Sequence, residues 1–336
     1  MARYIIRRLF GVAAVLIVIS ILTFGIFYLI PADPAVKACG KTCPPERLAE
    51  IREKLGLDKP VFLAWPPSDS QYGKFAKGIV FGRDFEGGGS NKRCDAPCLG
   101  FSFVTDQPVT DELKDRLPVT FSIAIGAAVM WLVAGVSVGI LSALRRGSIF
   151  DRTAMTIALG GVSLPPYFTG LVFLTIFCFK NQIFAIPAYH SFFDNPFLWA
   201  KGLFLPWVTL AFLFAALYAR LTRANMLETL GEDYIRTARA KGLPEKTVIG
   251  KHALRAALTP IVTIFGLDLG GLLGGAILTE SLFGLPGLGK FAIDAIGAAD
   301  QPKILGVVLV AAFFIVMANL IVDILYAFVD PKVSYS

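Results

Sequence analysis

Long uncharged runs of apolar residues dominate the chain. The first run, residues 9–30, has 22 residues and as a helix would be about 33 Å long, close to the thickness of the hydrocarbon core of a bilayer. It is longer than the apolar part of a typical signal peptide, and no small-residue cleavage site follows it. The pattern therefore predicts a retained first membrane span.

Further apolar runs predict five more spans. They cover residues 119–144, 153–179, 203–219, 256–282 and 304–329. Pro165 and Pro166 lie inside the third run of the chain, where each removes a backbone donor and crowds the preceding turn, so we expect a kink there. The fold class predicted is an all-α membrane protein with six transmembrane helices and a long loop between the first two.

Composition and charge agree with this reading. The chain is 55% hydrophobic and 17% charged, whereas about a quarter of the residues of a soluble domain are charged. If both termini are cytoplasmic, the inner segments hold 15 Lys and Arg and the short outer loops hold 4, as the positive-inside rule requires. The net charge of +7 thus indicates orientation, and no nucleic-acid partner is needed to explain it.

The outer loop at residues 31–117 is too long for a simple connector, so we expect it to be partly structured. A short helix is predicted at residues 45–55, where apolar side chains share one face and Gly56 follows. Residues 82–103 resemble a Gly/Ser-rich insertion with a mobile tip.

Four of the five cysteines lie in this loop, as Cys39, Cys43, Cys94 and Cys98. On the outer, oxidising side of the membrane we expect disulfides, although four cysteines allow three pairings and the sequence does not choose among them. A zinc site and reduced thiols are the alternatives. Cys178, in the third run, is interpreted as a small buried apolar residue.

Three carboxylates interrupt or end the apolar runs, namely Asp268, Glu280 and Asp323. A charge within the membrane is costly, so such acids normally face the interior of the bundle or a water-filled cavity. For Asp268 both a pore-lining role and a structural hydrogen bond are open. We expect Glu280 at the outer membrane interface and Asp323 in a pair with a group on the cytoplasmic side.

Glycine patterns occur in the fifth run and just after it. Gly270 and Gly274 recur four residues apart, a spacing that favours close helix packing in lipid. Residues 284–291 (GLPGLGKF) fit the phosphate-loop pattern GxxxxGK, but Phe follows where Ser or Thr would hold magnesium. We interpret this stretch as a turn. The chain has only two histidines, so neither a catalytic triad nor a His-based metal site is supported by the sequence.

The most specific pattern lies between the fourth and fifth runs. Residues 232–249 read EDYIRTARAKGLPEKTVI, and HALRAALTP follows at residues 252–260. We predict a helix over about 232–241, a stop at Gly242 and a second short helix with Pro244 in its first turn. Such a basic amphipathic unit is suited either to lie on the membrane surface or to dock onto a partner.

This segment resembles the EAA loop of permeases of binding-protein-dependent ABC importers, in the form typical of the dipeptide/oligopeptide/nickel branch. The likeness extends over nearly the whole chain through blocks such as RYIIRRL, PADPA, SLPPYFTG and LLGGAILTESLFGLPGLGK. It implies a type I ABC importer permease fold. The implied division is a cytoplasmic N-terminus and first span at 1–30, an extracytoplasmic subdomain at 31–117, a permease core at 118–330 that contains a coupling loop at 223–255, and a tail at 331–336.

The resemblance also implies a function and partners. The chain would be a non-catalytic half of the pore of an ATP-driven importer of di- or oligopeptides, in the plasma membrane of a bacterium or archaeon, with both termini cytoplasmic. Its partners would be membrane lipid, a second homologous permease in a heterodimer, two ATPases that bind ATP and Mg, and an extracytoplasmic solute-binding protein. No cofactor is expected in this chain. A nickel chelate or other small solute is the alternative cargo, and a proton-coupled carrier is the alternative class.

The same resemblance places a coupling helix at residues 243–250, seated in a groove of an ATPase. The coupling contacts that it implies are Arg236, Thr237, Ala238, Gly242, Leu243, Pro244, Glu245 and Lys246. Arg236 stands where the broad family has Glu, a change that the peptide branch commonly shares.

Overall fold

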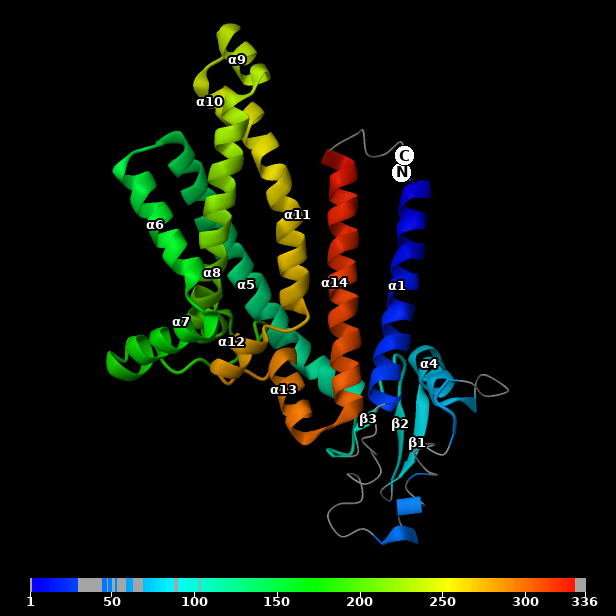
Figure 1. Cartoon of the computed structure of the whole chain (residues 1–336). Coiled ribbons are helices and arrows are strands. Elements are labelled where there is room, and N and C mark those ends of the chain that lie inside the picture. Colours follow the sequence, from blue (N-terminus) through cyan, green and yellow to red (C-terminus); the bar gives the residue numbers. More distant parts are fainter. Residues whose placement is uncertain are drawn as a thin grey trace.

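A computed structural model describes residues 2–29, 44–46, 48, 49, 52, 59–62, 69–87, 90–102 and 104–329. Within this part of the chain, five helices are long and apolar enough to cross a membrane. They are α1 (Ala2–Leu29), α5 (Val109–Leu144), α8 (Pro196–Gly231), α11 (Leu254–Leu273) and α14 (Gln301–Val329). The start of α1 and the end of α14 lie at one end of the bundle, and the strands lie at the other (Figure 1).

The third predicted span is bent. Its first half is α6 (Ile149–Ser163), and its second half is α7 (Pro166–Phe173), continued by the π-helical η2 (Leu174–Lys180). The two halves meet at 104°. The break falls at the proline pair, which confirms the predicted kink, but so sharp a bend makes this run a broken span or a re-entrant loop.

The fifth predicted span is divided, so the prediction of one helix over 256–282 was wrong. After α11 the chain turns and forms α12 (Ile277–Leu282), then α13 (Leu288–Ala298). Gly275 in the turn has φ +129°, and a Cβ there would lie 2.9 Å from the backbone nitrogen of Gly289. The turn thus requires glycine on both counts, and it folds α12 and α13 back across the end of the bundle where the strands lie, called the outer end here after its predicted side (Figure 1).

Close packing between α11 and α14 depends on the glycines spaced by four. A Cβ on Gly270 would lie 2.5 Å from Cβ of Ala318, and one on Gly274 would lie 3.0 Å from Cβ of Ala311. The predicted packing role of this pair is confirmed. Side chains of any size at these positions would push the two helices apart.

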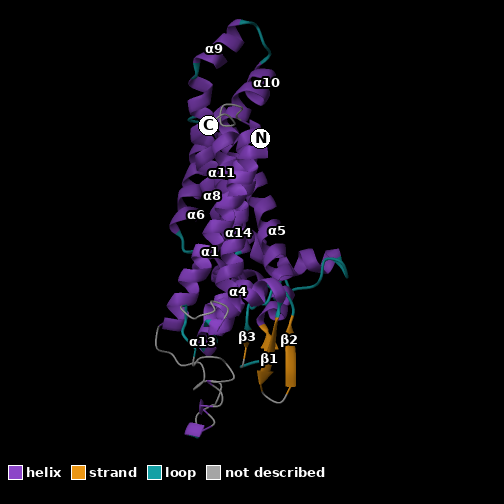
Figure 2. Ribbon diagram, turned by 90° about the vertical axis from the view of Figure 1, so that its right-hand side faces the viewer, coloured by secondary structure: helices purple, strands orange, loops and turns teal. Residues whose placement is uncertain are grey.

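The outer subdomain contains strands that the sequence pattern did not predict. Helix α4 (Gln71–Phe81) leads into a hairpin of β1 (Arg83–Gly87) and β2 (Ser90–Cys94), and two short strands, β3 (Phe101–Ser102) and β4 (Gln107–Pro108), follow (Figure 2). The supposed insertion at 82–103 is therefore largely structured, and its tip, residues 88 and 89, lies outside the described residues. Most of the predicted helix at 45–55 also lies outside them.

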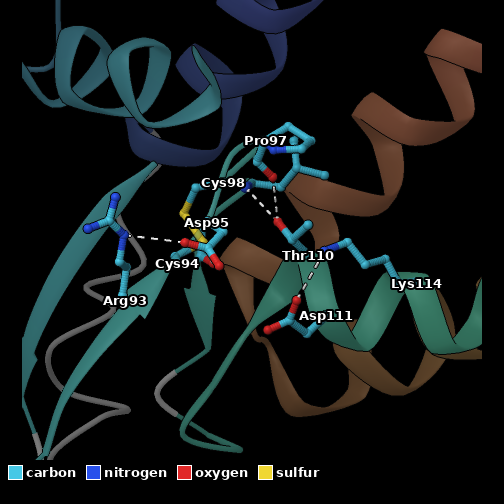
Figure 3. Close-up of a disulfide and its surroundings, with 10 residues drawn as sticks. Arg93, Cys94, Asp95, Pro97, Cys98, Thr110, Asp111 and Lys114 are labelled. Carbon is cyan, nitrogen blue, oxygen red and sulfur yellow. Dashed lines mark hydrogen bonds and ion pairs between the residues drawn. A yellow bond between two sulfur atoms is a disulfide. The ribbon is translucent and has the colours of Figure 1, made fainter. Parts of the chain in front are cut away.

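A disulfide joins Cys94 to Cys98, with their Cα atoms 5.5 Å apart (Figure 3). The disulfide expected for the cysteines of this loop is thus confirmed for this pair, and neither sulfur is free to bind zinc. Thr110 at the start of α5 binds the turn, because its hydroxyl donates to Pro97 O (2.7 Å) and accepts from the Leu99 N–H (3.0 Å). Cys39 and Cys43 lie outside the described residues. Cys178 is a buried free thiol, as predicted.

Candidate functional site

The predicted coupling segment has the helix–glycine–helix form read from the sequence. Helix α9 (Asp233–Ala240) ends before Gly242, whose φ of +75° favours glycine, and α10 (Glu245–Thr247) follows. The π-helical η3 (Val248–Ala253) then runs into α11. The segment lies at the same end of the bundle as the start of α1 and the end of α14 (Figure 1).

Apolar side chains attach this segment to the membrane helices. Ile235 and Val248 are 0% exposed and join a cluster that includes Met226 of α8 and Ala143 of α5. A close-packed cluster transmits displacement rather than absorbing it. A displacement of the segment would therefore be transmitted to α5, α8 and α11.

The opposite face of the segment is polar and open to a partner. Of the residues assigned to coupling, seven are exposed: Arg236, Thr237, Gly242, Leu243, Pro244, Glu245 and Lys246. Ala238 is 7% exposed and lies in the apolar cluster. Helix α9 turns this position toward α5 and α8, and the coupling role of Ala238 stays a prediction.

Arg239, which the sequence analysis did not single out, closes the segment across Gly242. Its Nη2 and Nε lie 2.7 Å and 3.2 Å from the two carboxylate oxygens of Glu245. The pair links α9 to α10. Both side chains are exposed, so solvent screens the pair and its contribution to stability is small; its main effect is on the shape of the turn.

A second ion pair near this end was also missed. Asp151 at the start of α6 receives Arg223 of α8 in a two-pronged contact, Nε to Oδ1 at 2.6 Å and Nη2 to Oδ2 at 2.8 Å. The Gly147 N–H adds a hydrogen bond of 2.9 Å. The Asp151 residue is 3% exposed. The only local signal was the spacing Ser148-x-x-Asp151, in which Ser148 caps α6; nothing in the sequence indicated Arg223.

Replacing Asp151 by Ala should lower the unfolding midpoint of the protein in detergent. The change leaves the Arg223 guanidinium without its two-pronged partner and the Gly147 N–H without its acceptor, which is destabilising; because the Arg223 side chain is 26% exposed, water compensates part of the loss. Thermal unfolding followed by circular dichroism measures the change. Asp233→Ala, which removes an exposed pair with Arg236, is the matched control and should leave the midpoint nearly unchanged; equal midpoints would contradict the account.

Glu280 occupies an enclosed polar site at the outer end of the bundle. Its carboxylate accepts hydrogen bonds from the backbone N–H groups of Gly289 (2.6 Å) and Lys290 (3.0 Å) and from the Thr120 hydroxyl (2.8 Å). The Thr120 hydroxyl in turn accepts from the Leu288 N–H at 2.8 Å. Glu280 is 0% exposed. It was expected at the membrane interface, and the folding back of α12 and α13 encloses it instead.

This arrangement explains the motif that imitates a phosphate loop. In GLPGLGK the backbone donors of Gly289 and Lys290 bind the carboxylate of Glu280. The donors that a phosphate would use are thus engaged by an anion of the same chain. The stretch joins α12 to α13, and the interpretation as a turn is confirmed.

Among the described residues, each of the other two acids contacts a side chain of another helix. The Tyr218 hydroxyl of α8 donates to Asp268 Oδ2 at 2.8 Å. Asp323 near the end of α14 pairs with Arg8 of α1 at 2.7 Å, which confirms the expected pairing. The Asp323 pair thus holds the first and last helices together at the end that carries the coupling segment.

A buried charged cluster links the outer subdomain to the bundle, and its pairing was not predicted. Lys303 at the start of α14 lies 2.9 Å from Glu112 of α5 and 3.8 Å from Asp300. The Ser102 hydroxyl of β3 donates to Asp300. Burial raises the pKa of the Asp300 carboxyl above its usual range.

No group of three or more His, Cys, Asp or Glu side chains that is arranged to hold a metal ion occurs among the described residues.

Two family models cover nearly the whole chain. Residues 1–124 match the N-terminal model of binding-protein-dependent transport system membrane components, and residues 135–335 match the model described as binding-protein-dependent transport system inner membrane component.

Curated relatives match the chain along its full length. The dipeptide transport system permease protein DppB of Escherichia coli (strain K12) is 37% identical over 359 residues, which cover 100% of this chain and 99% of the relative. DppB of Alkalihalophilus pseudofirmus is 37% identical over 355 residues, with 100% of both chains covered.

A solved structure shares the fold. A chain of the MetNI methionine ABC transporter, solved in inward facing conformations, matches with a TM-score of 0.50 at 19% identity. The match covers 66% of this chain and 97% of that one. The helical core therefore has the fold of an ABC importer permease.

Proposed function

This chain belongs to the family of binding-protein-dependent transport system inner membrane components, and from this premise we propose that it is a permease subunit of an ATP-driven importer of di- or oligopeptides. The observation that carries the proposal is the full-length similarity to relatives named dipeptide transport permeases. The chain is a multi-pass membrane protein, and its role is to form part of the path through which cargo crosses.

The orientation proposed has both termini and the coupling segment in the cytoplasm. The start of α1, the end of α14 and helices α9 and α10 share one end of the bundle (Figure 1). Basic residues are concentrated in the segments at that end, which supports a cytoplasmic placement. The outer subdomain then faces the extracytoplasmic side.

Two cytoplasmic ATPases are the proposed source of the driving force, and they would bind ATP and Mg. The exposed face of the coupling segment, Arg236, Thr237 and residues 242–246, is the surface proposed to contact one of them. Support comes from its two-sided construction, with an open polar face and an apolar face buried against α5 and α8. Closure of the ATPases would push the segment, and its packed face would move the membrane helices.

The remaining partners follow from the same proposal. A second, homologous permease would complete the pore, and a solute-binding protein would deliver cargo to the outer side. The domain division proposed is 1–30, 31–117, 118–330 and 331–336, with the coupling loop at 223–255. The buried cluster of Lys303, Glu112 and Asp300 supports a firm attachment of the outer subdomain to the core.

Co-purification tests this assignment. The tagged chain should be expressed with its genomic neighbours, solubilised and purified, and the subunits identified by mass spectrometry. We expect a second permease and ATPase subunits to copurify in stoichiometric amounts. Recovery of the chain alone, in a form that transports solute down a proton gradient, would contradict the proposal.

A further inference from the structure

Asp268 is held against an aromatic block inside the bundle. Its Oδ2 accepts the hydroxyl of Tyr218 at 2.8 Å, and Tyr218 is 0% exposed. The Tyr218 ring lies 6.2 Å from the ring of Trp131, which stacks on Phe214 at 4.6 Å. Close packing of these rings fixes the position of the Tyr218 hydroxyl. The hydrogen bond from this hydroxyl in turn fixes the position of Oδ2 of Asp268.

The other carboxylate oxygen is open. Oδ1 of Asp268 accepts no hydrogen bond from the described residues, and it is not among their enclosed atoms without a partner. No Lys, Arg or His of the described part of the chain forms an ion pair with Asp268. The residue is partly exposed, and the flank of α11 beside it includes Leu267, which is 49% exposed, and Gly271, where a Cβ would meet nothing within 4 Å.

Physical chemistry restricts what can lie against this open face. A carboxylate that faces lipid within a membrane is costly, so intramembrane acids face water or a counter-charge. Another face of α11 is covered by α14, where Gly266 and Gly270 approach Val322 and Ala318. The open face next to Asp268 is therefore expected to line the translocation path.

We propose that Oδ1 of Asp268 binds the α-ammonium group of the peptide in transit. This inference rests on the proposed function, because it assumes a peptide cargo. An ammonium group supplies the positive charge and the donors that the open oxygen lacks. Leu267 gives an apolar surface beside the carboxylate that accepts varied side chains, so the site recognises the peptide terminus, which all linear peptides share.

The test compares variants in the complete importer, reconstituted with its partner permease, ATPases and binding protein, and uses dialanine as the cargo. Asp268→Asn keeps the side-chain size and an acceptor for Tyr218 but removes the charge. We expect roughly tenfold less dialanine uptake per ATP hydrolysed, the size of one lost ionic contact, with ATPase stimulation by the loaded binding protein unchanged. Asp323→Asn is the matched control, because that aspartate is already paired with Arg8, and its uptake should equal wild type.

The outcomes separate this inference from the proposed function. If the wild-type complex does not take up dialanine, the peptide-importer function itself fails. If wild type transports and Asp268→Asn transports equally well, only the ammonium site is overturned. Loss of the partner permease from Asp268→Asn would assign the carboxylate to a cation of that subunit and would also overturn the site.

Tyr218→Phe gives a second measurement that does not depend on the assembly of Asp268→Asn. It keeps the charge and the ring packing but releases Oδ2, so the carboxylate is no longer held in one orientation. We expect a loss of dialanine uptake that is smaller than for Asp268→Asn, at wild-type levels of assembled complex. Uptake equal to wild type in this variant would count against the site.

Discussion

Replacing Glu280 by Ala is expected to produce a large loss of stability of the outer end of the bundle. The change leaves the Thr120 hydroxyl and the N–H groups of Gly289 and Lys290 buried without their acceptor. Each buried donor that loses its partner costs about 1–3 kcal/mol, so the total should exceed about 3 kcal/mol. Thermal unfolding of the purified protein in detergent measures this effect.

Hydrogen exchange locates the same effect. The amides of Gly289 and Lys290 should be protected in the wild type and should exchange quickly in Glu280→Ala. Glu228→Ala is the control, because Glu228 is an exposed residue of α8, and it should leave both the midpoint and the protection unchanged. Equal stability of the two variants would show that the carboxylate does not hold α12 and α13 in place.

Reversing the charge at Glu245 is expected to uncouple ATP hydrolysis from transport. Glu245→Arg changes the face proposed to contact the ATPase and sets a second cation beside Arg239. Uptake should fall at least roughly tenfold, the equivalent of one charged contact, while the complex remains assembled and hydrolyses ATP. Uptake in proteoliposomes together with phosphate release measures both quantities.

The double variant Arg239→Glu with Glu245→Arg separates docking from the internal pair. It restores an ion pair across Gly242 but keeps the charge at position 245 reversed. Because solvent screens this exposed pair and it contributes little, we expect the double variant to remain impaired. Full recovery of uptake in the double variant would show that the loss in Glu245→Arg comes only from the altered shape of the turn. Normal uptake in the single variant Glu245→Arg would show that residue 245 does not contribute to docking.

Local sequence patterns were sufficient for the straight spans and the coupling segment. An unbroken apolar run of about 20 residues is long enough to span the bilayer as a helix, and Gly242 followed by Pro244 marks the stop and restart between α9 and α10 by local backbone preference alone. The proline pair at 165 and 166 likewise placed the bend between α6 and α7, although the size of the bend depends on what these helices pack against.

Features that depend on distant residues were not predictable from one sequence. Asp151 meets Arg223 across 72 residues, and Thr120 meets Glu280 across 160, so neither pairing has a local signal. The division of α11 from α12 was missed because Gly275 lies within an apolar run, where hydropathy alone predicts a continuous helix. The β1–β2 hairpin was missed because its strands, RDFEG and SNKRC, are mostly polar and charged and lack the alternation of apolar residues that marks a strand.

The central claim is that this chain forms the membrane path of an ATP-driven peptide importer. The most direct measurement is uptake of radiolabelled dipeptide into proteoliposomes that contain the chain, its partner permease and the ATPases, with binding protein outside and ATP inside. The account predicts uptake that requires ATP and the binding protein and that persists when an ionophore removes the proton gradient. The account would be contradicted if uptake proceeded without ATP and if the ionophore abolished that uptake.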